Sequence, residues 1–146
     1  MKEVHIVVGV LAIGLNAVAG VYGAWCWWRA ISPAWFWRLL RSAQVVIVLE
    51  AALGGVLTLM GHKPPGLHVV YGLLPLAVSF IGEQLRAVSA QMVLDARGFS
   101  SAADVGQLPA DEQRRVVVAI VQREVGVMAL AALVIVVLLA RAAGTS

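Results

Sequence analysis

Long apolar stretches separated by short polar connections dominate the pattern of this chain. Four of them, about 4–28, 43–60, 67–86 and 125–141, are long enough to cross a bilayer as helices. A Gly- and Pro-rich loop at 61–66 separates the second from the third. The connection 87–124 is mostly polar: the third helix can continue to Asp95, Gly98 begins a break, and Pro109 begins an amphipathic helix that leads into the fourth span. The pattern therefore predicts a single all-α membrane domain over residues 1–146.

The first stretch also has features of a secretory signal peptide. Lys2 is followed by an apolar run and by the small residues Ala17-Val18-Ala19, an arrangement typical of a cleavage site. The apolar run continues well beyond those residues and ends at aromatic side chains, which favours a retained transmembrane helix.

Composition agrees with this class. The chain is 61% hydrophobic and only 13% charged, and its mean hydropathy of +0.89 is far above that of a soluble domain. The only cysteine is Cys26, so neither a disulfide nor a paired-cysteine metal motif can form within the chain. The net charge of +3 is better explained by membrane topology than by nucleic-acid binding, and no nucleic-acid partner is expected.

Tryptophans and arginines define the expected orientation. Five tryptophans lie between residues 25 and 37, where their amphipathic rings would mark one headgroup layer. Ser32-Pro33 is a helix start, and the helix that follows is expected to run along this interface into the second span. Eight arginines lie on the tryptophan side and three basic residues on the other (Lys2, Lys63, Arg141). The arginine-rich side is therefore predicted to be cytoplasmic, with both termini outside, in a bacterial plasma (inner) membrane.

The first and third spans begin in the same way. His5 is followed four residues later by Gly9, and His68 by Gly72, with further matches at Val and Leu positions. Both helices run in the same direction, so the two histidines should start at the same depth. This similarity predicts an integral membrane four-helix bundle, possibly a duplicated helix hairpin, with cytoplasmic helical extensions of its third and fourth helices.

Three polar residues are predicted to meet near the bilayer centre. Counting from the outer end places Asn16, Glu50 and Ser79 at similar depth, about 15 Å at 1.5 Å per residue. Glu50 should then be too deep to reach His68, and its carboxyl group should be protonated, hydrogen-bonded to Asn16 or Ser79, or both protonated and hydrogen-bonded. An intramembrane cluster of this kind either connects helices by hydrogen bonds or forms part of a transport pathway.

Two histidines at one depth on neighbouring helices suit a b-type haem, and we expect His5 and His68 to be its iron ligands. Gly9 and Gly72 would leave room for the macrocycle, with Tyr71 alongside. Lys63 would be placed for the propionates, as would the other basic residues of the outer face. The alternative is a pair of interfacial histidines without a cofactor. No catalytic motif is present, so an enzyme is not the favoured class.

A histidine that opens a helix, Leu53-Gly54-Gly55 in the next helix and His68 after a short loop together resemble one half of haem A synthase. That family has two four-helix halves, each with a histidine pair facing a haem on the outer side of the membrane. The similarity covers roughly residues 3–79 and implies a haem site at His5 and His68. Two departures concern the family's Glu-x-x-His-Arg motif: Glu3 is only two residues before His5, and Ile6 replaces the arginine. Four spans hold only one such half.

Three functions are compatible with these features. The first is a haem b protein for electron transfer or for haem or oxidase maturation. The second is a non-catalytic subunit or assembly factor of a larger membrane complex, or a homo-oligomer, that docks through its arginine-rich extensions. The third is a small transporter, or a proton or metal pathway, that uses Glu50.

Overall fold

The computed structural model describes residues 1–145, over which helices are the only regular secondary structure. In chain order the helices are α1 (Lys2–Trp28), α2 (Ala34–Leu59), α3 (Gly66–Ala87), α4 (Ser89–Ala96), α5 (Ala102–Gly106) and α6 (Ala110–Ala143). Four of them, α1, α2, α3 and α6, are long and apolar enough to cross a membrane. The all-α prediction and the number of candidate spans are therefore confirmed.

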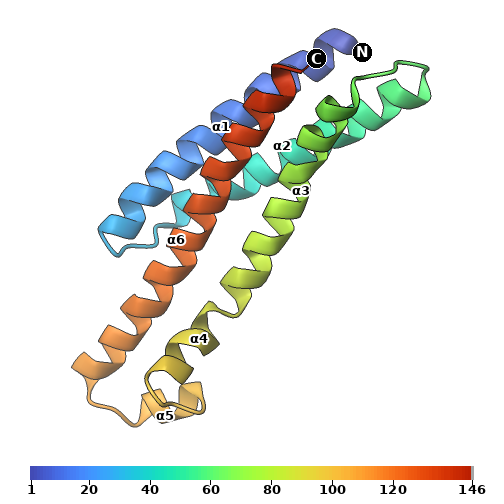
Figure 1. The fold of residues 1–146 in the computed structure, drawn as a ribbon. Coiled ribbons are helices and arrows are strands. Elements are labelled where there is room, and N and C mark those ends of the chain that lie inside the picture. Colours follow the sequence, from blue (N-terminus) through green and yellow to red (C-terminus); the bar gives the residue numbers. More distant parts are fainter. Residues whose placement is uncertain (146) are drawn as a thin grey trace.

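Helix α6 holds the other long helices together. It packs along α1 and along α3, whereas α2 packs mainly on α1 and touches α3 much less. Both termini lie at the same end as the α2–α3 loop, which we call the histidine end (Figure 1). At the opposite, tryptophan end, α6 and the α3–α4 segment extend well beyond the α1–α2 loop. Because α6 has neighbours on two sides, it is also the most buried of the candidate spans.

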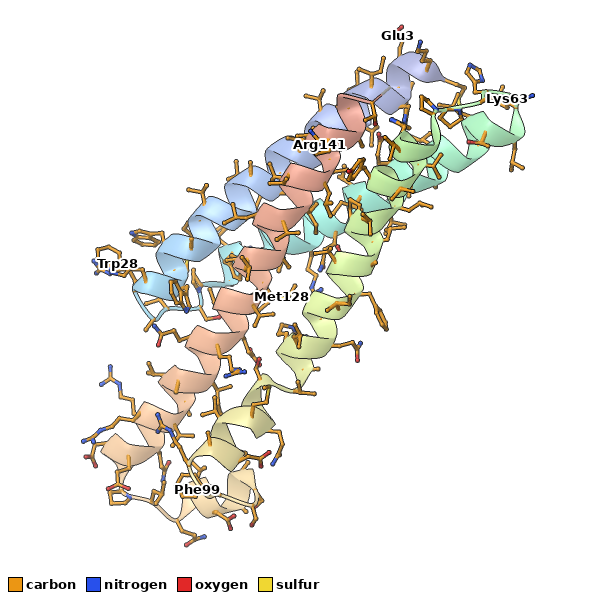
Figure 2. All side chains as sticks on the ribbon, viewed as in Figure 1. Glu3, Trp28, Lys63, Phe99, Met128 and Arg141 are labelled. Carbon is orange, nitrogen blue, oxygen red and sulfur yellow. The ribbon has the colours of Figure 1, made fainter. Side chains whose placement is uncertain are left out.

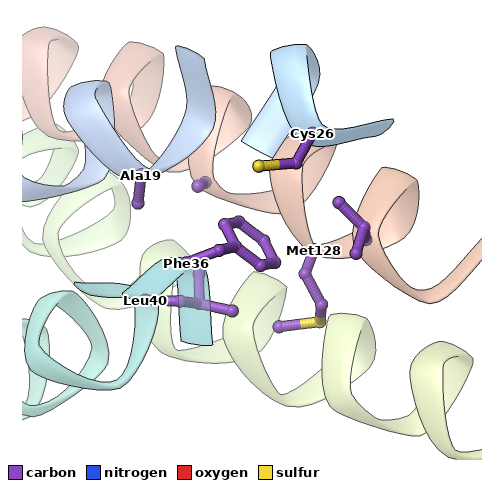
Figure 3. Packing of buried hydrophobic residues seen from close by; sticks show 7 residues of the cluster. Ala19, Cys26, Phe36, Leu40 and Met128 are labelled. Carbon is purple, nitrogen blue, oxygen red and sulfur yellow. The ribbon is translucent and has the colours of Figure 1, made fainter. Parts of the chain in front are cut away.

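Two apolar clusters fill the space between the long helices. The cluster nearer the tryptophan end joins three helices and surrounds the fully buried ring of Phe36 (Figure 3); its buried members are Ala19, Cys26, Phe36, Leu40, Val125, Met128 and Ala132. The second cluster, of Ala12, Ile47, Ile135 and Leu139, lies closer to the histidine end. Small residues allow close approach: a Cβ on Gly20 would be 2.6 Å from the Leu133 side chain. This is the packing expected where helices associate by close contact in lipid.

Several helix boundaries differ from those expected. The helix expected to run along the interface into the second span is present as α2, but its N-cap residue is Pro33, which had been expected at the first helical position after Ser32. The third helix does not continue smoothly to Asp95, because it ends at Ala87 and α4 begins at Ser89. At this break the Ser89 hydroxyl donates to the Leu85 carbonyl at 2.8 Å, a side-chain bond that competes with regular helix hydrogen bonding.

The polar connection contains a short helix that the sequence pattern did not predict. Ser101 and Asp104 form a capping box at the start of α5, and the Ser100 hydroxyl donates to Asp104 at 2.7 Å. These hydrogen bonds hold the pKa of Asp104 below its usual value. A third apolar cluster, of Val93, Leu94, Val105 and Val116, joins α4, α5 and the first half of α6. The extension is thus a packed unit with its own small core.

Glu83 connects α3 to α2 through a network of charges and amides. Its carboxylate accepts hydrogen bonds from Arg41 (2.5 and 3.1 Å), from Gln44 (2.9 Å) and from Arg86 (3.0 Å). The Arg86 guanidinium also lies 5.5 Å from the centre of the Trp37 ring. Since α2 and α3 otherwise make few contacts, this network is their main connection away from the α2–α3 loop.

We expect Glu83→Ala to destabilise the protein by about 1–2 kcal/mol, because it leaves two arginines without their shared acceptor at a half-exposed site. Unfolding in mixed detergent–SDS micelles would measure the change. Asp111→Ala is the matched control: its carboxylate makes a single ion pair with Arg115, at 3.3 Å, on a largely exposed surface. Equal losses in the two variants would contradict a special role for Glu83.

Candidate functional site

His5 of α1 and Glu50 of α2 lie against each other near the histidine end. Nδ1 of His5 is 3.1 Å from Oε1 of Glu50, and both side chains are mostly buried. Each packs over a glycine of the other helix: a Cβ on Gly9 would be 2.8 Å from the Glu50 oxygen, and one on Gly54 would be 3.5 Å from the His5 ring. The spacing is reciprocal, because each polar residue is followed four positions later by the glycine that accommodates its partner.

The contact between the two side chains is close but poorly aligned for a hydrogen bond. Nδ1 of His5 has no partner with hydrogen-bond geometry among residues 1–145, and neither has Oε2 of Glu50. The interaction at 3.1 Å is therefore electrostatic rather than directional. With an ionised Glu50, it favours the His5 tautomer that carries its proton on Nδ1.

His68 of α3 is oriented by the last turn of α6. Its Nδ1 lies 2.9 Å from the carbonyl oxygen of Ala142. Because a carbonyl can only accept, Nδ1 must be the donor, and the lone pair of a neutral His68 is then on Nε2. The His5 and His68 ring centres are 6.0 Å apart, with an interplanar angle of 71°. The two predicted ligands are thus brought together, one from each of two helices.

This arrangement has the features of a metal-binding histidine pair. Histidines that bind metals usually present their second ring nitrogen to a carboxylate or a backbone carbonyl. Here the Ala142 carbonyl accepts a hydrogen bond from His68, and the Glu50 carboxylate lies close to His5 without hydrogen-bond geometry. Two imidazoles that bind one metal from opposite sides, at about 2 Å each, have ring centres roughly 6 Å apart. The observed separation of 6.0 Å agrees with that distance.

The side chains of this site suit a bare metal ion less well than they suit haem. Among residues 1–145, no group of three or more His, Cys, Asp or Glu side chains is arranged to hold a metal ion. A haem needs only two axial ligands from the protein, because its macrocycle supplies the other donors. The donor set therefore fits haem better than it fits a bare metal ion.

The expected polar cluster at the bilayer centre does not form. Glu50 is beside His5, and no hydrogen bond connects it to Asn16 or Ser79. Asn16 donates instead to the Ala12 carbonyl at 2.8 Å, within its own helix. The depth count assumed helices that end level with one another, but Glu50 is one turn nearer the histidine end than Ile47, which packs on Ala12. That apolar layer lies between Glu50 and Asn16.

The two glycines expected to make room for a macrocycle, Gly9 and Gly72, differ in how much space lies beside them. The space beside Gly9 is filled by the Glu50 carboxylate, so the expectation of an open face there is wrong. Gly72 has no neighbouring atom within 4 Å of a Cβ built on it, apart from its own helix backbone, and its side remains open. Any macrocycle would therefore lie on the Gly72 side of the histidine pair.

The other predicted residues lie at the same end of the molecule. The ring centre of Tyr71 is 5.9 Å from the Arg141 guanidinium carbon. Lys63 is exposed on the α2–α3 loop, at the end that also carries Glu3 and Arg141 (Figure 2). Of the basic residues expected near the propionates, Arg141 lies over Tyr71 of the third helix, whereas the Lys63 side chain makes no ion pair within the described residues.

Comparisons with known proteins add no relative. No family model, curated protein or solved structure matches the chain. The resemblance to haem A synthase therefore stays a prediction, and the functional argument depends on the geometry of the site alone.

Two contributors to the site were not predicted as members of it. Gly54 appeared only as part of the Leu-Gly-Gly segment, although its spacing from Glu50 equals that of Gly9 from His5. This equal four-residue spacing is the sequence feature that could have indicated a role for Gly54 in the site. Ala142 contributes through its backbone carbonyl, which no side-chain pattern could reveal.

Proposed function

We propose that this chain is an integral membrane protein that binds one b-type haem, with His5 and His68 as axial ligands. The observation that carries the proposal is the pair of imidazoles 6.0 Å apart, each with Nδ1 facing an oxygen acceptor, so that both Nε2 atoms can bind iron. A bound haem would supply one-electron chemistry. The proposed role is electron transfer or participation in haem or oxidase maturation, and no catalytic group is assigned.

The protein's part in this function is to hold and orient the two ligands. Ala142 fixes the tautomer of His68, and Glu50 favours the matching tautomer of His5 when it is ionised. Hydrogen bonding at the distal nitrogen raises ligand basicity and is one means by which a protein tunes a haem potential. Gly54 allows His5 to lie close to α2, which restricts its ring to one region of the site.

The orientation of the site is also a proposal. The count of eight arginines against three basic residues favours a cytoplasmic tryptophan end in a bacterial plasma membrane, which puts the histidine end outside. The four-helix bundle as a duplicated hairpin is proposed from the His-and-Gly similarity of the first and third helices. The different packing of α2 and α6 gives that duplication no support from the second and fourth helices.

Haem titration of the detergent-purified protein tests the proposal. We expect saturable binding at one haem per chain, with a Soret band and the sharp visible bands of low-spin, bis-imidazole iron. The same protein should be coloured when it is expressed with a haem precursor. A colourless protein that also fails to bind added haem above the level of empty detergent micelles would contradict the proposal.

A second candidate function is that of a subunit in a larger membrane complex. It is favoured by the packed extension of α4, α5 and the first half of α6, which projects beyond the α1–α2 loop (Figure 1). Partner proteins that co-purify with the full chain and are lost when this extension is removed would support it, whereas a chain that co-purifies with no partner would count against it.

A further inference from the structure

A hollow of about 550 Å³ lies on the extension at the tryptophan end, far from the histidine pair. Its lining comes from the first half of α6 and from the residue that follows α4: Arg97, Asp111, Arg114, Arg115, Val118, Ala119 and Gln122. The volume is within the range of small-ligand sites, which is about 300–1,000 Å³. It is much larger than a single inorganic ion requires.

The charge of this hollow is positive and partly uncompensated. The guanidinium groups of Arg97 and Arg114 make no hydrogen bond or ion pair with any residue from 1 to 145. Arg115 pairs with Asp111 at 3.3 Å, on the same helix. The three arginines and one carboxylate leave two unpaired guanidinium groups that face a common space. Guanidinium groups bind phosphate oxygens through paired, charge-assisted hydrogen bonds.

The hollow also has a polarity gradient along α6. Arg114 and Arg115 lie toward the start of the helix, and Val118 and Ala119 lie one turn nearer the span. Gln122, the last lining residue along the helix, donates to the Trp27 carbonyl at 3.2 Å. Trp27 belongs to the tryptophan group that marks the headgroup layer. The apolar part of the hollow is therefore at the level where lipid headgroups meet the hydrocarbon, and the charged part is farther from the bilayer.

We propose that this hollow binds a phosphate-bearing anion, with Arg97 and Arg114 as its phosphate ligands. Arg115 stays paired with Asp111, whose carboxylate opposes an anion and limits affinity. The chemistry suits the headgroup of an anionic phospholipid or a soluble phosphate ester of similar size. This site is distant from the histidine pair, so a failure of the haem proposal would not affect this one.

Thermal unfolding of the full chain in neutral detergent tests the proposal. The probes are dioctanoyl phosphatidylglycerol, the zwitterionic dioctanoyl phosphatidylcholine and glycerol 3-phosphate. We expect a dose-dependent rise of the unfolding temperature with the anionic lipid and none with the zwitterionic one. An equal rise with glycerol 3-phosphate would identify a soluble phosphate ester as the ligand, whereas its absence would identify the lipid; either result supports an anion site.

Variants separate this site from general attraction between charges. Arg97→Gln/Arg114→Gln should weaken the apparent affinity about tenfold, whereas Arg29→Gln/Arg38→Gln, which removes the same charge at the same end but outside the hollow, should leave it unchanged. Asp111→Asn should tighten binding about threefold, an effect that faulty folding cannot imitate. Failure of all probes to shift unfolding, equal losses in both double variants, or no gain in Asp111→Asn would each overturn the proposal.

Discussion

Loss of either histidine of the pair is expected to abolish the bis-imidazole haem spectrum. In His5→Ala or His68→Ala, one axial ligand is missing, so the visible bands of low-spin iron should disappear and haem affinity should fall at least about a hundredfold, roughly 2.7 kcal/mol or more. Absorption spectroscopy during haem titration measures both effects. No other change in the chain should alter the spectrum as strongly.

His62→Ala is the matched control for these variants. His62 is also at the histidine end, but it lies exposed in the α2–α3 loop, so its loss should leave the spectrum intact. Glu50→Gln should keep both ligands and the low-spin bands while it changes the reduction potential, because Glu50 contacts the ligand and not the iron. A normal spectrum in both histidine-to-alanine variants would refute the axial assignment.

Gly23→Leu is expected to cause the largest loss of stability among single changes in the packed interior. A Cβ on Gly23 would already lie 2.5 Å from the Phe36 ring and 2.8 Å from the Ala129 methyl group. Neither neighbour can move away, since Phe36 is fully buried and Ala129 nearly so. Such overpacking typically costs about 1–3 kcal/mol, and a leucine here should be at or above the upper limit. SDS-induced unfolding would measure the loss.

Gly14→Leu provides the comparison within the same helix. No atom outside its own helix backbone lies within 4 Å of a Cβ built on Gly14, so the added side chain would face open space. The two variants make the same chemical change in α1 and differ only in their surroundings. Equal stability of both would show that α1, α2 and α6 do not pack as described.

The apolar pattern was sufficient to predict the four long helices because a bilayer imposes one simple requirement on length and polarity. Their boundaries were less accessible. Ser32-Pro33 indicates the start of the second helix, which begins at Ala34, but the apolar pattern does not indicate the end of the third helix at Ala87. The short helix α5 depends on a capping box of Ser101 and Asp104. Such a motif is difficult to recognise in a connection where most residues are polar.

The histidine pair could be predicted because two helices of the same direction carry it at the same position. The partner of Glu50 could not, since residue counting gives depth along each helix but not how far one helix protrudes past another. Glu83 illustrates the same limit. Arg86 is three residues away on the same helix, a spacing typical of an ion pair, whereas Arg41, which contributes two of the hydrogen bonds, is on a different helix.

The position of α6 has a consequence for biosynthesis. It is translated after α1, α2 and α3, yet α1 and α3 depend on it for most of their packing, and its Ala142 carbonyl orients His68. While α6 is still inside the ribosome, the first three helices have no central partner in the membrane. The two histidines therefore reach their paired geometry only after translation has passed Ala142, and any cofactor between them would be inserted after α6 has been made.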